Sequence, residues 1–432
     1  MKRIVAGALT VLLLAACTSS LPAYSGRSAS LSQLTATSEA PSSPATATSE
    51  APSSPTTATS EAPSSPTTAA SATPALQAAQ IVARMSIPEQ VGQLFMVGVP
   101  LGKNHDITLE LVKNRSVGNI FLAGRSTASS AEVAALVAEF TAYEPAGLGM
   151  FVAVDQEGGY VQTLQGPGFS AIPTALAQAN SGLTSQEAAL WGEELAAAGV
   201  NLNLAPVADL VGTEPPTANA PIGYYERDYT TDPATIEKSI AAFITGMNAA
   251  GVGTVIKHFP GLGRVTENTD TAGGVTDTYT TRTDSSISIF AAGIRDGAAM
   301  VMASTAIYAL IDPSNPAAFS PAIISGILRG ELGYDGVCIT DDVSAAAQVA
   351  HYTPEERALA TINSGCDIIL ASADPTRAAA MIDAVTSEAT RDSSFANEVK
   401  ADATRVVTLK MERGLARSEP PLLAVTSPRS WQ

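Results

Sequence analysis

Eight apolar runs, each long enough to be a buried β-strand, recur between residues 93 and 372 and constrain the fold more than any other feature. Segments with a helical pattern separate several of them, at 131–143, 185–198, 232–249 and 354–363. Strands that are apolar along their whole length are typical of a parallel sheet covered by helices. Eight such units predict an α/β fold, a (β/α)8 barrel of TIM type. The predicted strands are 93–99, 119–124, 150–155, 200–209, 254–259, 300–305, 337–342 and 366–372.

The first 17 residues have the pattern of an export signal. Lys2 and Arg3 precede an apolar stretch that is too short to span a bilayer and that ends in Leu-Ala-Ala-Cys at Cys17. We expect Cys17 to be lipidated, so that the protein is extracytoplasmic and touches a membrane only through this lipid anchor. The alternative is an ordinary signal peptide that happens to contain a cysteine.

Residues 18–74 consist of Ser, Thr, Ala and Pro in low-complexity sequence, with TSEAPSSP repeated at Thr37, Thr48 and Thr59. So little apolar surface cannot offset the entropy of ordering the chain, which predicts a disordered linker. The predicted barrel occupies residues 75–415. The Pro-rich tail, 416–432, is too short for a further domain.

The formal net charge of −17 becomes about −19 once Lys2 and Arg3 are removed. This balance argues against nucleic acid as a partner, because nucleic acid requires a basic surface. We expect a monomer. With only three histidines in the chain we expect no metal site, and no cofactor is implied.

Two cysteines, Cys338 and Cys366, lie within apolar strand-like runs. A disulfide is possible in an extracytoplasmic protein. We favour two separate buried thiols that act as small hydrophobes.

Polar residues gather where the apolar runs end, at Asp155, Asp209, Lys257-His258 and Asp341. In a (β/α)8 barrel the carboxyl ends of the strands meet at one face, which is where catalytic groups lie. The pattern therefore predicts an active site that contains a cation, an imidazole and carboxylates.

The run KHFPGLG (257–263), followed by a strand that ends in TDD (340–342), resembles glycoside hydrolase family 3 in its short, single-domain β-N-acetylhexosaminidase branch. The resemblance covers about 330 residues. It implies a retaining mechanism in which Asp341 is the nucleophile, with Asp342 as a helix N-cap or hydrogen-bond partner. It also implies that Asp155, in VAVDQEGG, and Lys257 and His258 bind the sugar.

Two further matches to the family are looser. Arg227, in GYYERDY, resembles the family's sugar-binding arginine, and an exposed loop ion pair is the alternative. Asp209 also matches a family position, where it either ties loops together or touches substrate.

The chain departs from the family where the proton is transferred. The family has an Asp-(Ser/Thr)-His dyad on a mobile loop, and the corresponding residues here are Asn268, Thr269 and Asp270. Asp270 is our candidate acid/base, because a carboxyl group commonly has this role in glycosidases. Glu267 is a second candidate, and loss of the acid/base is the alternative. In addition, Tyr160 stands where the family usually has Arg, and Thr305 where it has His.

The resemblance implies a retaining exo-glycosidase that removes terminal β-linked N-acetylglucosamine from peptidoglycan-derived saccharides. Water is favoured over phosphate as the acceptor because Asp270 replaces the histidine. Two alternatives remain open: a β-glucosidase or β-xylosidase on the same barrel, and a non-catalytic sugar-binding lipoprotein.

Overall fold

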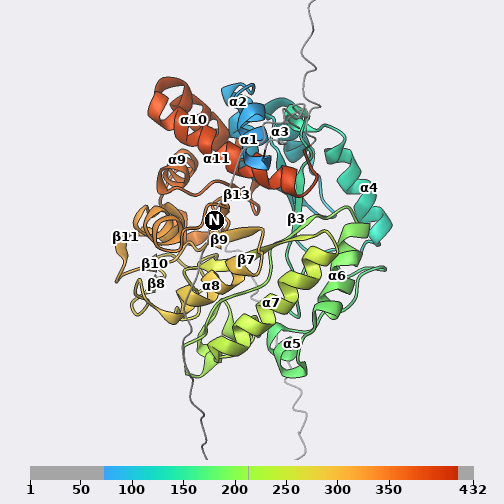
Figure 1. The fold of residues 1–432 in the computed structure, drawn as a ribbon, viewed down its shortest axis with the longest axis vertical. Helices are drawn as coiled ribbons and strands as arrows, with labels where there is room; N and C mark the ends of the chain where they lie inside the picture. Colours follow the sequence, from blue (N-terminus) through green and yellow to red (C-terminus); the bar gives the residue numbers. More distant parts are fainter. Residues whose placement is uncertain (1–72, 213, 417–432) are drawn as a thin grey trace, which may run out of the picture. The chain divides into compact units, whose positions relative to one another are not determined.

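The computed structural model of the protein describes residues 73–212 and 214–416. Eight parallel strands form one sheet in the order in which they occur along the chain, and helices surround it (Figure 1). This arrangement confirms the predicted (β/α)8 barrel. The strands are β1 (Phe95–Pro100), β2 (Asn119–Ala123), β3 (Phe151–Val154), β6 (Leu202–Asn203), β7 (Gly253–Phe259), β9 (Met300–Ala303), β12 (Val337–Thr340) and β13 (Ile369–Ala371).

The barrel closes between its last two strands. Ile339 and Ile368 form a single parallel bridge there, whereas β1 and β2 pair at five positions. Backbone hydrogen bonds cross the seam, from Thr340 N to the Ile368 oxygen and from Ile368 N to the Cys338 oxygen, both at 2.9 Å. Fewer backbone pairs therefore join β12 to β13 than join β1 to β2.

The strand β6 is much shorter than the predicted strand 200–209. The ladder ends at Asn203, although the Leu204 N–H still donates to the Val154 oxygen (2.8 Å) and the Ala205 oxygen accepts from the Val255 N–H (3.0 Å). Pro206 has no N–H to donate, and only an isolated bridge between Val207 and Lys257 follows. The irregular segment still leads to Asp209, which is fully buried.

Helices cover the outside of the barrel, and the helices predicted at 131–143, 185–198, 232–249 and 354–363 are confirmed as α4, α6, α7 and α9. Ser129, Thr184 and Thr353 begin α4, α6 and α9 with capping boxes. Consecutive helices such as α6 and α7 pack against each other. The helices are α1 (Pro74–Val82), α2 (Ile87–Gln93), α3 (Asp106–Arg115), α4 (Ser130–Thr141), α5 (Ala175–Ser181), α6 (Ser185–Ala197), α7 (Pro233–Ala249), α8 (Ser285–Arg295), the π-helix η5 (Ala322–Glu331), α9 (Pro354–Ser364), α10 (Ala378–Arg391) and α11 (Ser393–Glu412).

Short elements lie in the connections between barrel strands and helices. A hairpin follows β3, and a three-stranded sheet gathers segments that follow β7 and β9. The short strands are β4 (Gln156–Gly158), β5 (Val161–Gln162), β8 (Thr276–Asp277), β10 (Ile307–Tyr308) and β11 (Asp312–Pro316). The 3-10 turns are η1 (Pro145–Gly147), η2 (Pro216–Ala218), η3 (Gly223–Tyr225), η4 (Ala317–Phe319), η6 (Ala347–Val349) and η7 (Pro375–Arg377).

Cys338 and Cys366 form a disulfide, with their Cα atoms 4.9 Å apart. The expectation of two separate buried thiols was wrong. Each cysteine lies in an apolar run, but Cys338 is on β12 and Cys366 precedes β13, so closure of the barrel brings the two together.

The leader (1–17) with Cys17, the linker up to residue 72 and the tail from 417 lie outside the described residues. Helix α1 begins at Pro74, one residue before the predicted start of the barrel domain. Within residues 73–212 and 214–416 no helix has both the length and the apolar character needed to cross a membrane.

Candidate active site

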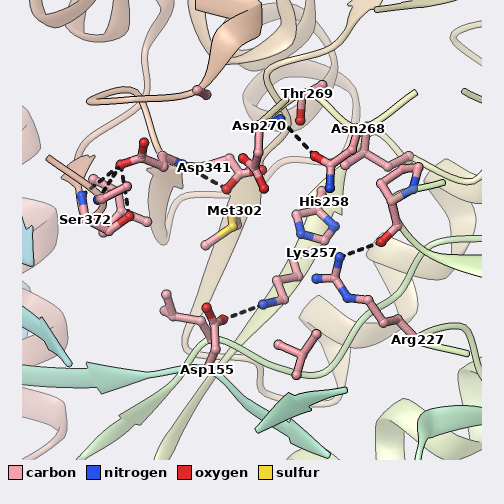
Figure 2. A pocket seen from close by; sticks show the side chains of 18 of the residues that line it. Asp155, Arg227, Lys257, His258, Asn268, Thr269, Asp270, Met302, Asp341 and Ser372 are labelled. Atoms are coloured by element: carbon pink, nitrogen blue, oxygen red, sulfur yellow. Dashed lines mark hydrogen bonds and ion pairs between the residues drawn. The ribbon is translucent and has the colours of Figure 1, made fainter. Parts of the chain in front are cut away.

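A cavity of about 570 Å³ opens where the barrel strands end, and all six of the predicted catalytic and sugar-binding residues line it (Figure 2). Each comes from the end of a strand or from the loop that follows it. Parallel strands bring residues that are far apart in the sequence to one face of the barrel in this way. These residues are Asp155, Arg227, Lys257, His258, Asp270 and Asp341.

The floor of the cavity contains a network of opposite charges around Lys257. Its Nζ lies 2.7 Å from Asp155 Oδ1 and 2.7 Å from Glu157 Oε1. Arg227 forms a bidentate pair with Glu157, with Nε and Nη2 at 2.9 and 2.8 Å from the two carboxylate oxygens. Arg227 is thus mostly buried against the cavity, and the alternative of an exposed loop ion pair is wrong.

The buried charges of this network fix one another's protonation. Burial by itself raises the pKa of Glu157, but the positive charges of Arg227 and Lys257 lower it to about 2. Burial opposes the charge of Lys257, yet the neighbouring Asp155 and Glu157 raise its pKa. Lys257, Arg227 and Glu157 therefore remain ionised, and the network offers fixed donors and acceptors to a polar ligand.

His258 is oriented by Asp209. Its Nδ1 lies 2.7 Å from Asp209 Oδ2, while Asp209 Oδ1 accepts hydrogen bonds from the backbone N–H groups of His258 (3.1 Å) and Leu262 (2.7 Å). Asp209 is fully buried and does not line the cavity. Of its two expected roles, Asp209 has the first, because it holds the loop after β7. Among the described residues, only Nδ1 of the His258 ring has a hydrogen-bond partner.

Asp341 follows β12 directly. Its backbone N–H donates to the Ala303 oxygen (2.8 Å), and its Oδ1 accepts from the N–H of Asp342 (2.8 Å). Burial raises the pKa of Asp341, while His258, the Asp342 N–H and Lys257 act in the opposite direction. Burial outweighs these three, so the pKa of Asp341 lies above the ordinary value for aspartate, although each of the three favours the ionised carboxylate.

Asp342 lines the same cavity, but hydrogen bonds from neighbouring loops occupy its carboxylate. Its carboxylate accepts hydrogen bonds from the Ser344 hydroxyl and from Ser372, as well as from the Ala345 and Ala373 backbone. Asp342 thus joins the loops after β12 and β13. Of the two roles expected for it, helix N-cap or hydrogen-bond partner, it has the second.

Asp270 lies beside Asp341 in the cavity, on the loop after β7 (Figure 2). Its N–H donates to Asn268 Oδ1 (2.8 Å), which shapes the turn. The residue is open to solvent through the cavity mouth, but the protein around its carboxyl group excludes part of that water. This desolvation, together with the negative charge of Asp341, raises the pKa of Asp270 to about 6. The two carboxyl groups therefore interact, and the negative charge on Asp341 raises the pKa of Asp270.

Three further residues that the sequence singled out, Glu267, Thr305 and Tyr160, differ in where they lie. Glu267 lines a neighbouring hollow rather than the cavity that contains Asp341. Thr305 is buried, and its hydroxyl has no hydrogen-bond partner among the described residues. Tyr160 is 58% exposed and lines the mouth of the cavity. Among residues 73–212 and 214–416 no three His, Cys, Asp or Glu side chains are placed to hold a metal ion.

Sequence reasoning missed Glu157, which holds Arg227 and Lys257 in place from two residues beyond Asp155. The sequence did contain a signal for Glu157, since it is a second acid, after Asp155, close to the end of a buried strand. A buried acid requires cationic partners, and this requirement could have pointed to Lys257 and Arg227. Arg125 and Ser372 also line the cavity and have no comparable signal in the sequence.

The glycosyl hydrolase family 3 N-terminal domain matches residues 86–409. A β-hexosaminidase from Stenotrophomonas maltophilia is 36% identical over 270 residues, which are 60% of this chain and 77% of that protein.

Solved structures show the same relationship. A β-N-acetylhexosaminidase from Beutenbergia cavernae is 52% identical with a TM-score of 0.75, over 76% of this chain and 99% of that one. A family 3 β-N-acetylglucosaminidase from a Paenibacillus species is 29% identical with a TM-score of 0.69, over 80% of this chain and 66% of that one. The protein is a glycoside hydrolase, and the chain belongs to glycosyl hydrolase family 3.

Proposed function

We propose that the protein is a retaining exo-glycosidase that removes terminal β-linked N-acetylglucosamine. One observation carries the proposal: Asp341 and Asp270 face the same cavity in different electrostatic environments. His258 and Lys257 oppose the rise that burial imposes on the pKa of Asp341, whereas desolvation and the negative charge of Asp341 raise the pKa of Asp270 to about 6. A carboxylate nucleophile and a carboxylic acid are the two groups that retaining hydrolysis needs. The choice of sugar is supported by the names of the similar proteins.

In the first step, an Asp341 carboxylate oxygen attacks the anomeric carbon. The bond from that carbon to the leaving oxygen breaks, and Asp270 gives its proton to the leaving group. In the second step Asp270 takes a proton from water, the water oxygen attacks the same carbon, and Asp341 leaves as the carboxylate. Asp155, Lys257, His258 and Arg227 hold the sugar hydroxyl groups during both steps.

We further propose that the substrates are cell-wall saccharides and that the protein is exported and anchored through Cys17. The disulfide between Cys338 and Cys366 is of a kind that persists in oxidising compartments, which supports export. Labelled fatty acid should be incorporated into the wild-type protein in cells but not into Cys17→Ala. Equal labelling of both proteins contradicts the anchor.

The enzymatic proposal is tested with p-nitrophenyl β-glycosides of N-acetylglucosamine and of glucose, on the purified full-length protein. We expect turnover of the N-acetylglucosamine glycoside, with the β-anomer of the sugar as the first product by NMR. Asp341→Asn should abolish turnover. Asp270→Asn should lower it, with azide restoring part of the rate. Asp335→Asn, at an exposed acid in the loop before β12 and outside the cavity, is the matched control.

Each other outcome identifies a different function. Turnover of the glucoside alone indicates a β-glucosidase, and an α-anomer as first product contradicts retention. If neither glycoside is turned over while N-acetylglucosamine still binds, the protein is a sugar-binding lipoprotein. Full activity in Asp270→Asn removes Asp270 from the mechanism.

A further inference from the structure

A second hollow, of about 610 Å³, adjoins the active-site cavity. The two share Tyr225 and Asn268 in their walls, so these two residues form the border between them. Apart from these two, the walls of the second hollow are polar or small, with hydroxyl and carboxyl groups among them. They are Ala220, Tyr224, Thr266, Glu267, Thr271 and Ala272.

Three tyrosines gather at this junction although they are exposed to solvent. Tyr160 and Tyr224 are 58% and 61% exposed, and Tyr225 is 39% exposed. Tyr225 lies between the other two, with its ring centroid 5.8 Å from that of Tyr160 and 4.9 Å from that of Tyr224, both edge to face. Single exposed aromatic side chains are common on protein surfaces, but a contacting group of three at the mouth of a binding cavity indicates an interaction site.

The backbone holds the three rings from two separate loops. Tyr160 follows Gly158 and Gly159, whose φ angles of 108° and 55° allow the sharp turn after β4. Tyr224 and Tyr225 lie in η3, where buried Asn219 accepts hydrogen bonds from the Ile222 and Gly223 N–H groups. The same Asn219 donates to the Leu262 and Val265 oxygens at 2.7 Å each, so η3 is fixed to the loop after β7.

We propose that Tyr160, Tyr224 and Tyr225 form a subsite for the first sugar ring of the leaving group. The proposal rests on the proposed glycosidase function. A β-linked pyranose presents C–H groups on its faces and hydroxyl groups at its edge. Rigid aromatic rings match the faces, and Thr266, Glu267, Asn268 and Thr271 match the edge. An exo-acting enzyme needs such a surface directly beyond the cavity that holds the terminal sugar.

The location of the subsite also follows from the chemistry. Asp270, the proposed proton donor to the leaving oxygen, is two residues from Asn268, which lines both hollows. The scissile oxygen therefore lies at the border that Tyr225 and Asn268 share. The terminal sugar occupies the cavity beside Asp341, and the leaving ring lies across the border, between Tyr160 at the mouth of this cavity and Tyr224 in the second hollow.

The test compares two substrates that differ only in the leaving group, N,N′-diacetylchitobiose and methyl β-N-acetylglucosaminide. Both leaving groups are alkyl alcohols, so their demand for protonation is similar, but only the disaccharide has a ring for the subsite. We expect Tyr160→Ala and Tyr225→Ala to lower kcat/KM for the disaccharide about 3- to 10-fold more than for the methyl glycoside. Tyr225→Phe, which keeps the aromatic ring, should retain most of the wild-type preference for the disaccharide over the methyl glycoside.

Tyr279→Ala is the matched control, because Tyr279 is 69% exposed and lines neither hollow. Equal losses on both substrates, or no loss on either, overturn the subsite. If the wild-type protein turns over neither substrate, it is the proposed function that fails. Calorimetry then decides the subsite: weaker binding of the disaccharide alone in Tyr225→Ala supports it, and unchanged binding overturns it.

Discussion

Gln348 holds both backbone polar groups of Val275 and thereby joins the loop of Asp270 to the loop of Asp341. Its Oε1 accepts from the Val275 N–H (2.8 Å), and its Nε2 donates to the Val275 oxygen (3.0 Å). The backbone N–H groups of Ala347 and Gln348 also donate to the oxygens of Asp270 (3.1 Å) and Thr269 (3.0 Å). In the family, this loop is expected to be mobile. Here four hydrogen bonds dock it on the segment that follows Asp341.

Replacing Gln348 with Ala should release this loop. Because Asp270 would then spend time farther from Asp341 and closer to water, its pKa should fall. Since protonated Asp270 is the proposed acid, the alkaline limb of kcat/KM should shift to lower pH, and kcat should decrease about 10-fold. Gln186→Ala, an exposed glutamine on α6, is the control. A lower kcat with an unshifted pH profile would show that Gln348 positions the loop without changing the pKa of Asp270.

The raised pKa of Asp270 should depend on the charge of Asp341. In Asp341→Asn that charge is absent, so the pKa of Asp270 should move down from about 6 toward the ordinary value for aspartate, while desolvation keeps it somewhat above. The measurement is a carbon-13 NMR titration of labelled aspartate carboxyl groups, with Asp270→Asn to assign the signal. An unchanged titration would mean that desolvation alone sets this pKa.

Glu157→Gln should weaken both folding and substrate binding. The change leaves buried Lys257 and Arg227 with one carboxylate fewer, and breaking a buried ion pair costs about 3–5 kcal/mol. Because the folded-state pKa of Glu157 is lowered to about 2, its contribution to stability is complete above about pH 4.5 and is lost as pH falls toward 2. Denaturant unfolding between pH 7 and 2 should show a shallower pH dependence in this variant than in the wild type. Glu193→Gln, outside the cavity, is the control.

The disulfide should stabilise the seam between β12 and β13. It closes a loop of 28 residues, for which the chain-entropy relation gives about 3–4 kcal/mol. The double variant Cys338→Ala/Cys366→Ala should therefore unfold at lower denaturant concentration than the oxidised wild type. Reduced wild type should resemble the variant. If the oxidised and reduced proteins unfold at the same denaturant concentration, the disulfide does not stabilise the seam. The β-bridge between Ile339 and Ile368 and the side-chain packing would then be enough to close the barrel.

Lys410, on α11, should make stability depend on pH. It is fully buried at the opposite end of the barrel, where Nζ donates to Gln93 Oε1 (2.7 Å) and to the Gly118 oxygen (3.0 Å), and burial lowers its pKa to about 7. Between about pH 7 and 10 the unfolded state binds a proton that the folded state does not. The free energy of unfolding should therefore rise with pH, by up to about 1.4 kcal/mol per unit.

Lys410→Met should remove this slope, while Lys400→Met, at an exposed position on the same helix, should keep it. The measurement is urea unfolding of the three proteins from pH 7 to 10. Parallel slopes in all three would mean that Lys410 stays charged in the folded protein.

The sequence by itself determined the barrel and the face that carries the site. A strand buried on both sides must be apolar throughout, so 254–259 and 337–342 could be recognised from local pattern alone. Once eight such strands are parallel, their carboxyl ends must share one face. For that reason Asp155, Lys257, His258 and Asp341 could be placed together without coordinates.

Only the tertiary structure decided how these residues are held. The disulfide, the pairing of Glu157 with Arg227, the clamp of Gln348 on Val275 and the contact of Tyr160 with Tyr225 all join different strands or loops. Hydropathy and turn patterns report a residue's own neighbourhood, whereas these partners are set by how the strands close and how far each loop reaches over the barrel. The sequence can therefore indicate which residues end the strands, while three-dimensional packing decides which side chains meet above them.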